Sequence, residues 1–209
     1  MERLAKNIAV NIGENLQYST EKTAVVAYGL IAIFQMFIIF FILSIIGFMG
    51  GFWIEGTIIF FFVGLLRKSV GGAHSKTFFG CVIYSVLFIS LMAFLSHYFI
   101  NPNLLYYYIA LSGLSFSFSY LVVYKKAPVD SPNKPIRKEK KIKRLRINAF
   151  VTLTIYFIAV AVLYYLSKKD LRFSGYAISV TMAVLWQIFM LTESGHKFMQ
   201  VIDRKMVDF

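Results

Sequence analysis

The chain has 209 residues, of which 58% are hydrophobic and only 15% are charged. A soluble domain usually contains about 45–50% apolar and about 25% charged residues, so a water-soluble core could not bury this much apolar surface. The formal net charge of +12 would suggest nucleic-acid binding in a soluble protein. Here the charges cluster between apolar stretches, so we expect them to set membrane topology, with no nucleic-acid partner. Cys81 is the one cysteine, which excludes an internal disulfide and a cysteine-rich metal site, and we expect no metal and no cofactor.

Residues 1–22 come first and predict an amphipathic helix on the membrane surface. Apolar residues recur every four positions with polar residues between them, at Leu4, Ile8, Ile12 and Leu16. Such a helix can rest its apolar face in the inner headgroup layer. A frayed polar tail is the alternative.

Six apolar stretches follow, and each is a candidate transmembrane helix because a span needs roughly 20 residues. The predicted spans are about 24–48, 52–66, 81–100, 104–124, 148–166 and 173–191. The second is the least regular, since Glu55 interrupts its start and about 15 residues reach only roughly 22 Å. We expect an all-α integral membrane protein, with about six transmembrane helices and the N-terminal helix in one membrane domain over residues 1–209.

Lysine and arginine predict the direction in which the spans run. With the N-terminus inside, 19 of the 22 Lys and Arg residues fall in inner segments, and the outer loops hold only Lys168, Lys169 and Arg172. We therefore expect both termini in the cytoplasm. Ten of the inner charges lie in a loop at 125–146, where three prolines prevent a continuous helix: Pro128, Pro132 and Pro135.

The stretch 67–81 differs from the lipid-facing bulk of the chain. It reads RKSVGGAHSKTFFGC and lies at the inner face between the second and third predicted spans. A cysteine protease needs a thiol and a base that accepts its proton, and His74 and Cys81 stand seven residues apart. The plain alternatives are a packing role for the cysteine and a solvated histidine. His97 falls at the opposite membrane face, whereas His196 in the inner tail remains an alternative base.

Geometry restricts how the two side chains could meet. Seven residues along one unbroken helix rise roughly 10.5 Å, which is too far for a hydrogen bond of about 3 Å. Glycines can break the helix and let the chain turn, at Gly71, Gly72 and Gly80. A cysteine in the first turn of the third span would lie near the positive end of the helix dipole and near Arg67, Lys68 and Lys76, which favours a thiolate.

These residues resemble a known family of bacterial membrane endopeptidases. The matching elements are the basic pair Arg67-Lys68, the run Gly71-Gly72-Ala73-His74, Cys81, and the proline-rich segment 127–136 followed by a basic run. With six predicted spans in about 200 residues, the chain resembles the accessory gene regulator B (AgrB) family over essentially its whole length.

The resemblance implies a function. AgrB-like proteins remove the C-terminal tail of a small precursor peptide, AgrD, and help to convert the remainder into a cyclic quorum-sensing signal. His74 and Cys81 match the family's catalytic pair, and Arg67 and Gly72 match positions that the family also uses at its site. The resemblance further implies a bacterial cell membrane location, an AgrD-like partner, contact with membrane lipids and a possible homodimer.

The expected activity is therefore that of a membrane-embedded cysteine endopeptidase that forms an acyl-enzyme thioester leading to a cyclic thiolactone. One hypothesis is that basic residues of the loop hold an acidic precursor tail, namely Lys138, Lys140, Lys141, Lys143 and Arg144. The alternative is that the loop only fixes topology and contacts anionic lipid. Two rival classes stay open: a small membrane transporter or exporter of a peptide without proteolytic activity, and a non-enzymatic scaffold or receptor.

Overall fold

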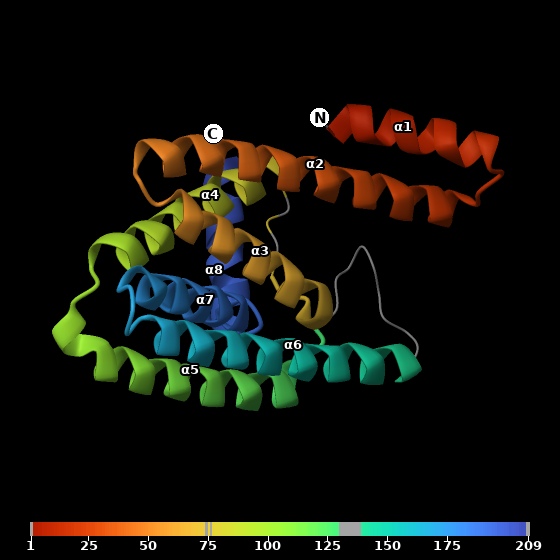
Figure 1. Cartoon of the computed structure of the whole chain (residues 1–209). Coiled ribbons are helices and arrows are strands. Elements are labelled where there is room, and N and C mark those ends of the chain that lie inside the picture. The colour runs from red at the N-terminus through yellow and green to blue at the C-terminus, as the bar shows by residue number, and fades with distance from the viewer. Residues whose placement is uncertain (1, 74, 76, 130–138, 208–209) are drawn as a thin grey trace.

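The computed structural model describes residues 2–73, 75, 77–129 and 139–207, the last three of these by their backbone only. These residues form helices joined by turns, with no strand among them (Figure 1). The helices are α1 (Glu2–Asn15), α2 (Thr20–Met49), α3 (Trp53–Val70), α4 (Phe78–Tyr98), η1 (Pro102–Leu104), α5 (Leu105–Lys126), α6 (Glu139–Leu166), α7 (Arg172–Phe189) and α8 (Glu193–Val207).

The predicted all-α membrane fold is confirmed, and the number of spans is approximate. Four described helices are long and apolar enough to cross a bilayer by themselves: α2, α4, α5 and α6. A fifth candidate is the pair α7 and α8, which are bent by 82° against each other. The second predicted span corresponds to α3, which is not among these because it carries Glu55, Arg67 and Lys68.

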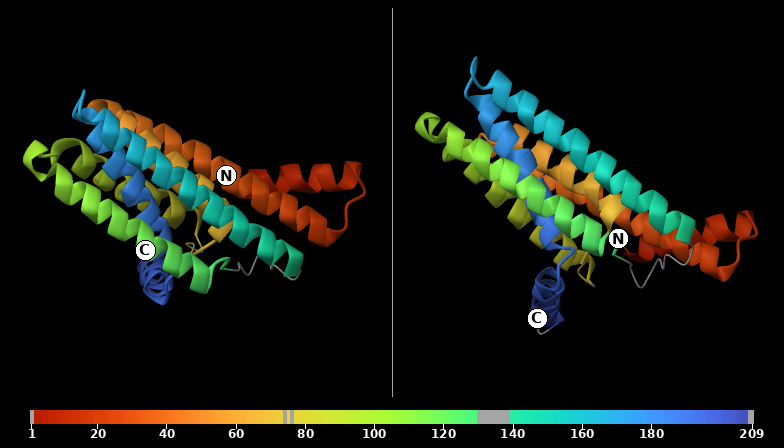
Figure 2. Two further views of the ribbon diagram at one scale, coloured as in Figure 1. Left: turned by 60° about the horizontal axis from the view of Figure 1, so that its bottom comes forward. Right: turned by 90° about the horizontal axis from the view of Figure 1, so that it is seen from below.

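Helix α7 occupies the centre of the bundle. It contacts α3, α4, α5 and α6, and Figure 2 shows it lying between these helices. Ten of its 18 residues are buried, and most of them are small or polar, such as Ser174, Gly175 and Ser179. Small residues let neighbouring backbones approach closely, which is how helices associate where lipid removes the hydrophobic driving force.

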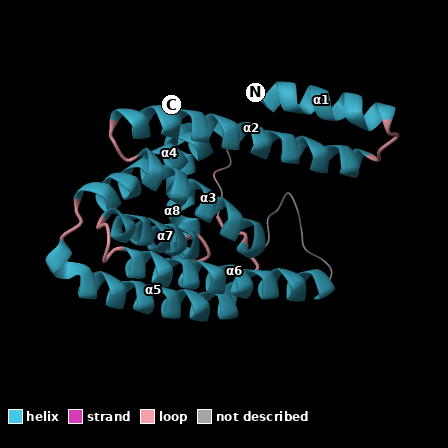
Figure 3. Ribbon diagram, viewed as in Figure 1, coloured by secondary structure: helices cyan, strands magenta, loops and turns pink. Residues whose placement is uncertain are grey.

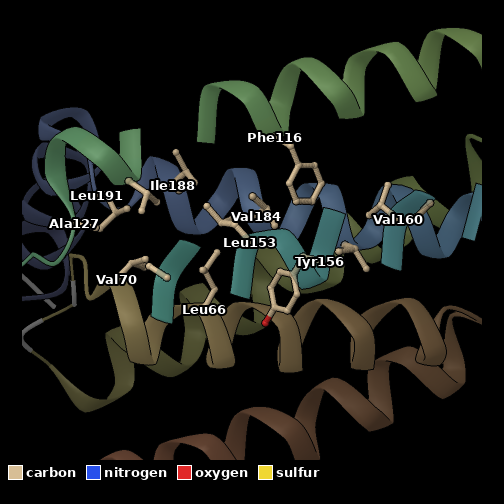
Figure 4. Close-up of a cluster of buried hydrophobic side chains, with 14 of the residues drawn as sticks. Leu66, Val70, Phe116, Ala127, Leu153, Tyr156, Val160, Val184, Ile188 and Leu191 are labelled. Atoms are coloured by element: carbon tan, nitrogen blue, oxygen red, sulfur yellow. The ribbon is translucent and has the colours of Figure 1, made fainter. Parts of the chain in front are cut away.

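The main core lies where α7 meets α3, α5 and α6. Figure 4 shows Leu66 and Val70 of α3 facing Leu153 of α6 and Val184 of α7. Tyr156 adds a polar link across this core, because its hydroxyl donates to the carbonyl oxygen of Phe62 at 3.0 Å. The core therefore fixes the end of α3 against α6 and α7, next to the segment that carries the candidate site.

The charge that interrupts the second predicted span is paired. Glu55 is 4% exposed, and its Oε1 lies 2.8 Å from Nδ1 of His97 on α4. An isolated carboxylate would be costly to bury, whereas a hydrogen-bonded one is tolerated. The pair joins α3 to α4 at the end of the bundle opposite the residues 71–77.

Helix α1 packs on the first half of α2, side by side with it in Figure 1. The prediction placed the helix at 1–22, and the structure has it at Glu2–Asn15. Its packed face consists of the small residues Ala5, Ala9 and Gly13. The apolar stripe starting at Leu4 is exposed or half-buried, one position round the helix from this seam, so it is turned toward the surroundings. Helix α1 thus has a small-residue face that packs on α2 and an apolar face that is turned outward. The hydrophobic pattern predicted only the apolar face.

The basic segment 125–146 is helical at both ends. Helix α5 continues to Lys126, and α6 begins at Glu139, nine residues before the predicted span. Figure 3 shows α6 extending beyond the ends of α3 and α5 at this side of the bundle. Arg146 joins the two helices, because its Nε donates to the carbonyl oxygen of Ala127 at 3.0 Å. The prolines at 132 and 135 lie outside the described residues.

Candidate active site

The chain turns sharply between α3 and α4, at the glycine pair. Helix α3 ends at Val70, and Gly71 and Gly72 follow with φ values of 72° and 126°. Side-chain-bearing residues rarely adopt these values, so the turn requires glycine. A Cβ on Gly72 would also approach the carbonyl oxygen of Met190 to 3.2 Å. The turn separates α3 from α4, and because Thr77 is the extended N-cap of α4, the helix that carries Cys81 begins only at Phe78.

Three hydrogen bonds pin the segment that follows α3. Gln187 of α7 donates from Nε2 to the carbonyl oxygen of Gly71 at 2.6 Å, and its side chain is fully buried. The amide of Ala73 donates to the carbonyl oxygen of Met190 at 2.9 Å. The amide of Val129, just after α5, donates to Val70 at 2.9 Å. The ends of α5 and α7 thus hold this segment by its backbone.

Cys81 lies in the first turn of α4, which begins at Phe78, three residues before the predicted span. Thr77 is the N-cap, and its Oγ1 accepts a hydrogen bond from the amide of Gly80 at 3.1 Å. Gly80 is therefore inside the helix and is not part of the turn. The amide of Cys81 donates to the carbonyl oxygen of Thr77, and Ser85, one turn later, forms a hydrogen bond with the thiol. The thiol is half-buried at the positive end of the helix dipole.

Arg67 connects α3 to the segment after the glycine turn and to Cys81 on α4. Its Nη2 donates to the carbonyl oxygen of Ala73 at 2.6 Å, and its guanidinium is close enough to Cys81 to interact with it electrostatically. Both residues line a small cavity of about 20 Å³, which is room for about one water molecule. Its other walls include Ser75, Ser85, Trp186, Met190 and Met199.

A comparison with known proteins gives this geometry a context. The accessory gene regulator B family model matches residues 5–191, which is nearly the whole chain. The chain belongs to the AgrB family. Two relatives from Clostridium perfringens, AgrB-like protein 2 of strain 13 / Type A and an AgrB-like protein of strain SM101 / Type A, are each 34% identical to it. Each comparison covers 97% of this chain and 96% of the relative. No solved structure matches the chain significantly.

Membership of the AgrB family confirms the resemblance predicted from the sequence. It links the chain to the processing of quorum-sensing peptides, and the multi-pass helical character fits a membrane protein. The relatives' names describe them only as AgrB-like and assign no catalytic residue.

The two histidines that the structure describes in this AgrB protein lie on different helices, α4 and α8. His74, the predicted base, lies outside the described residues, as does Lys76. His97 is in the last turn of α4, at the other end of the helix from Cys81. His196 lies on α8, where its Nδ1 is 3.0 Å from the carbonyl oxygen of Thr192, and it lines a different cavity from that of Cys81. Among the described residues no histidine lines the Cys81 cavity.

The basic residues predicted to hold a peptide tail lie on the first turns of α6. Lys140, Lys143 and Arg144 are exposed and Lys141 is half-buried, whereas Lys138 lies outside the described residues. These first turns lie at the same end of the bundle as the end of α3 (Figure 1). No group of described residues is arranged to hold a metal ion.

Two residues beside Cys81 were missed by the sequence reasoning. Ser75 donates from Oγ to Oδ1 of Asp203 on α8 at 2.5 Å, and Asp203 also interacts electrostatically with Cys81. A local signal existed for Asp203, because it shares a helical stripe with Met199 and Ile202, where an acid is unexpected. Its partner 128 positions away could not be read from that pattern.

Proposed function

We propose that this AgrB protein is a membrane-embedded cysteine endopeptidase, with Cys81 as nucleophile and His74 as base. Its substrate is a small AgrD-like precursor peptide, from which it removes the C-terminal tail. The remaining segment stays on Cys81 as a thioester, which leads to a cyclic thiolactone signal.

The observation that carries the proposal is that Cys81, Arg67, Ala73 and Ser75 line one cavity, where Arg67 holds Ala73 by a hydrogen bond. Burial of the thiol and the nearby Asp203 carboxylate oppose its ionisation, whereas two sources of positive charge favour it: Arg67 and the start of α4. A packing cysteine needs neither of these. The structure also gives a physical reason for the two candidate supporting residues: Arg67 donates a hydrogen bond to Ala73, and Gly72 adopts the backbone conformation that the turn requires.

The proposed first step is acyl transfer. The Cys81 sulfur attacks the scissile carbonyl carbon while His74 accepts the thiol proton. The peptide C–N bond then breaks, and the protonated histidine returns the proton to the leaving amine. The products are the released tail, with a free amine, and the rest of the precursor as a thioester on Cys81.

The second step closes the ring. A cysteine thiol within the precursor attacks the thioester carbonyl, and the Cys81 sulfur leaves. One thioester replaces another, so the energy of the activated bond is conserved and no ATP is needed. A site at the membrane interface that is partly shielded from water would favour ring closure over hydrolysis.

The orientation of the protein is part of the proposal. We place both termini in the cytoplasm because Lys and Arg are concentrated in the segments at that end. Cys81 then faces the compartment in which a newly made precursor is found.

Peptide export without proteolysis has less support. A transport path would use polar groups that are available to a substrate near the midplane. The serines of α5 are engaged instead: Ser115 and Ser119 donate to carbonyl oxygens one turn earlier, and Ser112 bonds with Tyr164 of α6 at 2.9 Å. Gln187 holds Gly71. These contacts are those of close helix packing.

Replacing Cys81 tests the proposal against export and scaffolding together. In a reconstituted assay Cys81→Ala should abolish precursor cleavage while the protein stays folded in the membrane. Cys81→Ser should be nearly as damaging, because one histidine ionises a hydroxyl far less readily than a thiol. Normal cleavage by Cys81→Ala would end the protease proposal, whereas export or scaffolding would survive either change.

A further inference from the structure

Helix α8 packs against the Cys81 site with a stripe that contains a buried carboxylate. Its buried positions are Gly195, Met199, Ile202 and Asp203, which recur at helical spacing. Figure 2 shows α8 projecting from the end of the bundle at a steep angle to the other helices. Three of the four buried residues are small or apolar. Asp203 is 8% exposed, and burying a carboxylate costs free energy unless hydrogen bonds offset that cost.

The carboxylate is directed at the segment between α3 and α4. Ser75 donates to Oδ1 of Asp203 at 2.5 Å, and the Ser75 hydroxyl also accepts from the amide of Thr77 at 3.2 Å. Thr77 is the N-cap of α4, the helix that carries Cys81. One turn before Asp203, Met199 lines the Cys81 cavity. The buried face of α8 therefore forms a wall of the site.

Hydrogen bonds anchor the two residues that flank position 74 in the sequence, Ala73 and Ser75. On one side, Ala73 is held by Arg67 at 2.6 Å and by the carbonyl oxygen of Met190 at 2.9 Å. On the other side, Ser75 is held by Asp203. The first anchor comes from α3 and α7. The second comes from α8, which lies beyond the residues 5–191 that the family model matches.

We propose that Asp203 is a positioning residue: its hydrogen bond to Ser75, together with the anchors of Ala73, fixes the two neighbours of the proposed base His74 beside the Cys81 cavity. The part that concerns the base rests on the proposed protease function. The docking of α8 on Ser75 does not rest on it, and the two parts are tested separately.

The kinetic test measures single-turnover precursor cleavage by the full-length protein in membranes. Asp203→Ala should lower the rate constant at saturating precursor about 10–100-fold, the equivalent of one hydrogen bond to a charged group, with little change in KM. Asp203→Asn keeps an acceptor for Ser75 and should recover part of the rate. Arg204→Gln, at the exposed neighbouring position, should cleave normally.

Ser75→Ala supplies the second arm of a double-mutant cycle. If the two residues act through their mutual bond, Ser75→Ala should cause a similar loss, and the double variant should lose little more. Fully additive losses would overturn the positioning role. So would an unchanged rate constant in folded Asp203→Ala protein, or a change confined to KM.

A cross-link tests the docking without using the reaction. In a Cys81→Ala background, the pair Ser75→Cys and Asp203→Cys should form a disulfide on mild oxidation, detected in digested protein by mass spectrometry. The pair Ser75→Cys and Arg204→Cys should form far less. Absence of the first cross-link in folded protein would overturn the docking itself. A cross-link together with cleavage by Cys81→Ala would mean that α8 docks as described while the protease proposal has failed.

Discussion

Arg67 and Gly72 show how single residues shape this site without acting as nucleophile or base. Arg67 spans from α3 to Ala73 while its charge lies near Cys81. Gly72 has a backbone conformation that other residues rarely adopt, against the carbonyl oxygen of Met190. Each therefore sets the path of the chain toward position 74, and its loss should affect catalysis more than membrane insertion.

Gly72→Ala should slow precursor cleavage while leaving the protein in the membrane. A side chain at φ 126° costs of order 1–3 kcal/mol, which the segment can relieve only by moving. Gly64→Ala is the matched control, since a Cβ there meets nothing within 4 Å. Cleavage rates and yields of both variants provide the measurement. Equal rates for the two would mean that the turn is not part of the site.

His74→Ala should slow formation of the acyl-enzyme by roughly 10²–10⁴, the usual contribution of a general base. His196→Ala should change the rate little, because His196 lines a separate cavity. Single-turnover cleavage measured side by side distinguishes the two histidines. A large loss with His196→Ala alone would contradict the pairing while leaving Cys81 as a candidate nucleophile.

At the scale of helices, hydrophobic stretches predicted where the elements lie better than where they end. Helices α2 to α7 overlap the six predicted ranges in order. The beginning of α6 was missed because its first turns are charged and project past the bundle, where a hydropathy pattern carries no information. Helix α8 was missed because it is short and amphipathic, in a tail that was considered only for its charge and for His196.

For the candidate site, the sequence likewise predicted the local residues but not the long-range contacts that hold them. His74, Cys81, Arg67 and Gly72 lie in one short stretch, so spacing and residue type brought them to attention. The contacts that build the site join α3 and α4 to α7 and α8, through Gln187, Met190 and Asp203. Such long-range contacts depend on helix packing, which a local pattern cannot reveal.

The basic turns of α6 provide a prediction about substrate capture. Replacing Lys140, Lys141, Lys143 and Arg144 by glutamine should weaken precursor binding by roughly 0.2–1 kcal/mol for each charge. The loss should shrink as salt screens the wild-type attraction. Binding of labelled precursor at low and high salt is the measurement, and glutamine at Lys168 and Lys169 in the opposite loop is the control.

A precursor with its acidic residues neutralised should be insensitive to the same substitutions. If affinity for the normal precursor stays unchanged at low salt, these residues only fix topology and contact anionic lipid. Tail recognition must then be sought elsewhere on the protein.

At the scale of the whole molecule, the bundle gathers the proposed chemistry at one end. The end of α3, the first turns of α6 and helix α8 all lie there (Figure 2), and the Glu55–His97 pair lies at the other end, where α3 begins and α4 ends. Function therefore depends on which end faces the cytoplasm.

Single-cysteine labelling should establish that orientation. In a Cys81→Ala background, Lys140→Cys should react with impermeant reagents only from the cytoplasmic side, and Lys169→Cys only from outside. Intact cells expose the outer face of the protein to the reagent, and inverted vesicles expose its cytoplasmic face. Labelling of Lys140→Cys from outside would reverse the topology and place Cys81 in the wrong compartment for an unexported precursor.

The most direct test of the central claim is to trap the thioester on Cys81. A precursor whose ring-closing cysteine is replaced by alanine cannot cyclise, so the acyl-enzyme should accumulate after tail release. Mass spectrometry after an acid quench should then find Cys81 carrying the N-terminal part of the precursor, in an adduct that hydroxylamine removes and that Cys81→Ala lacks. Tail release by the wild-type protein with no adduct on Cys81 at any time would contradict the account.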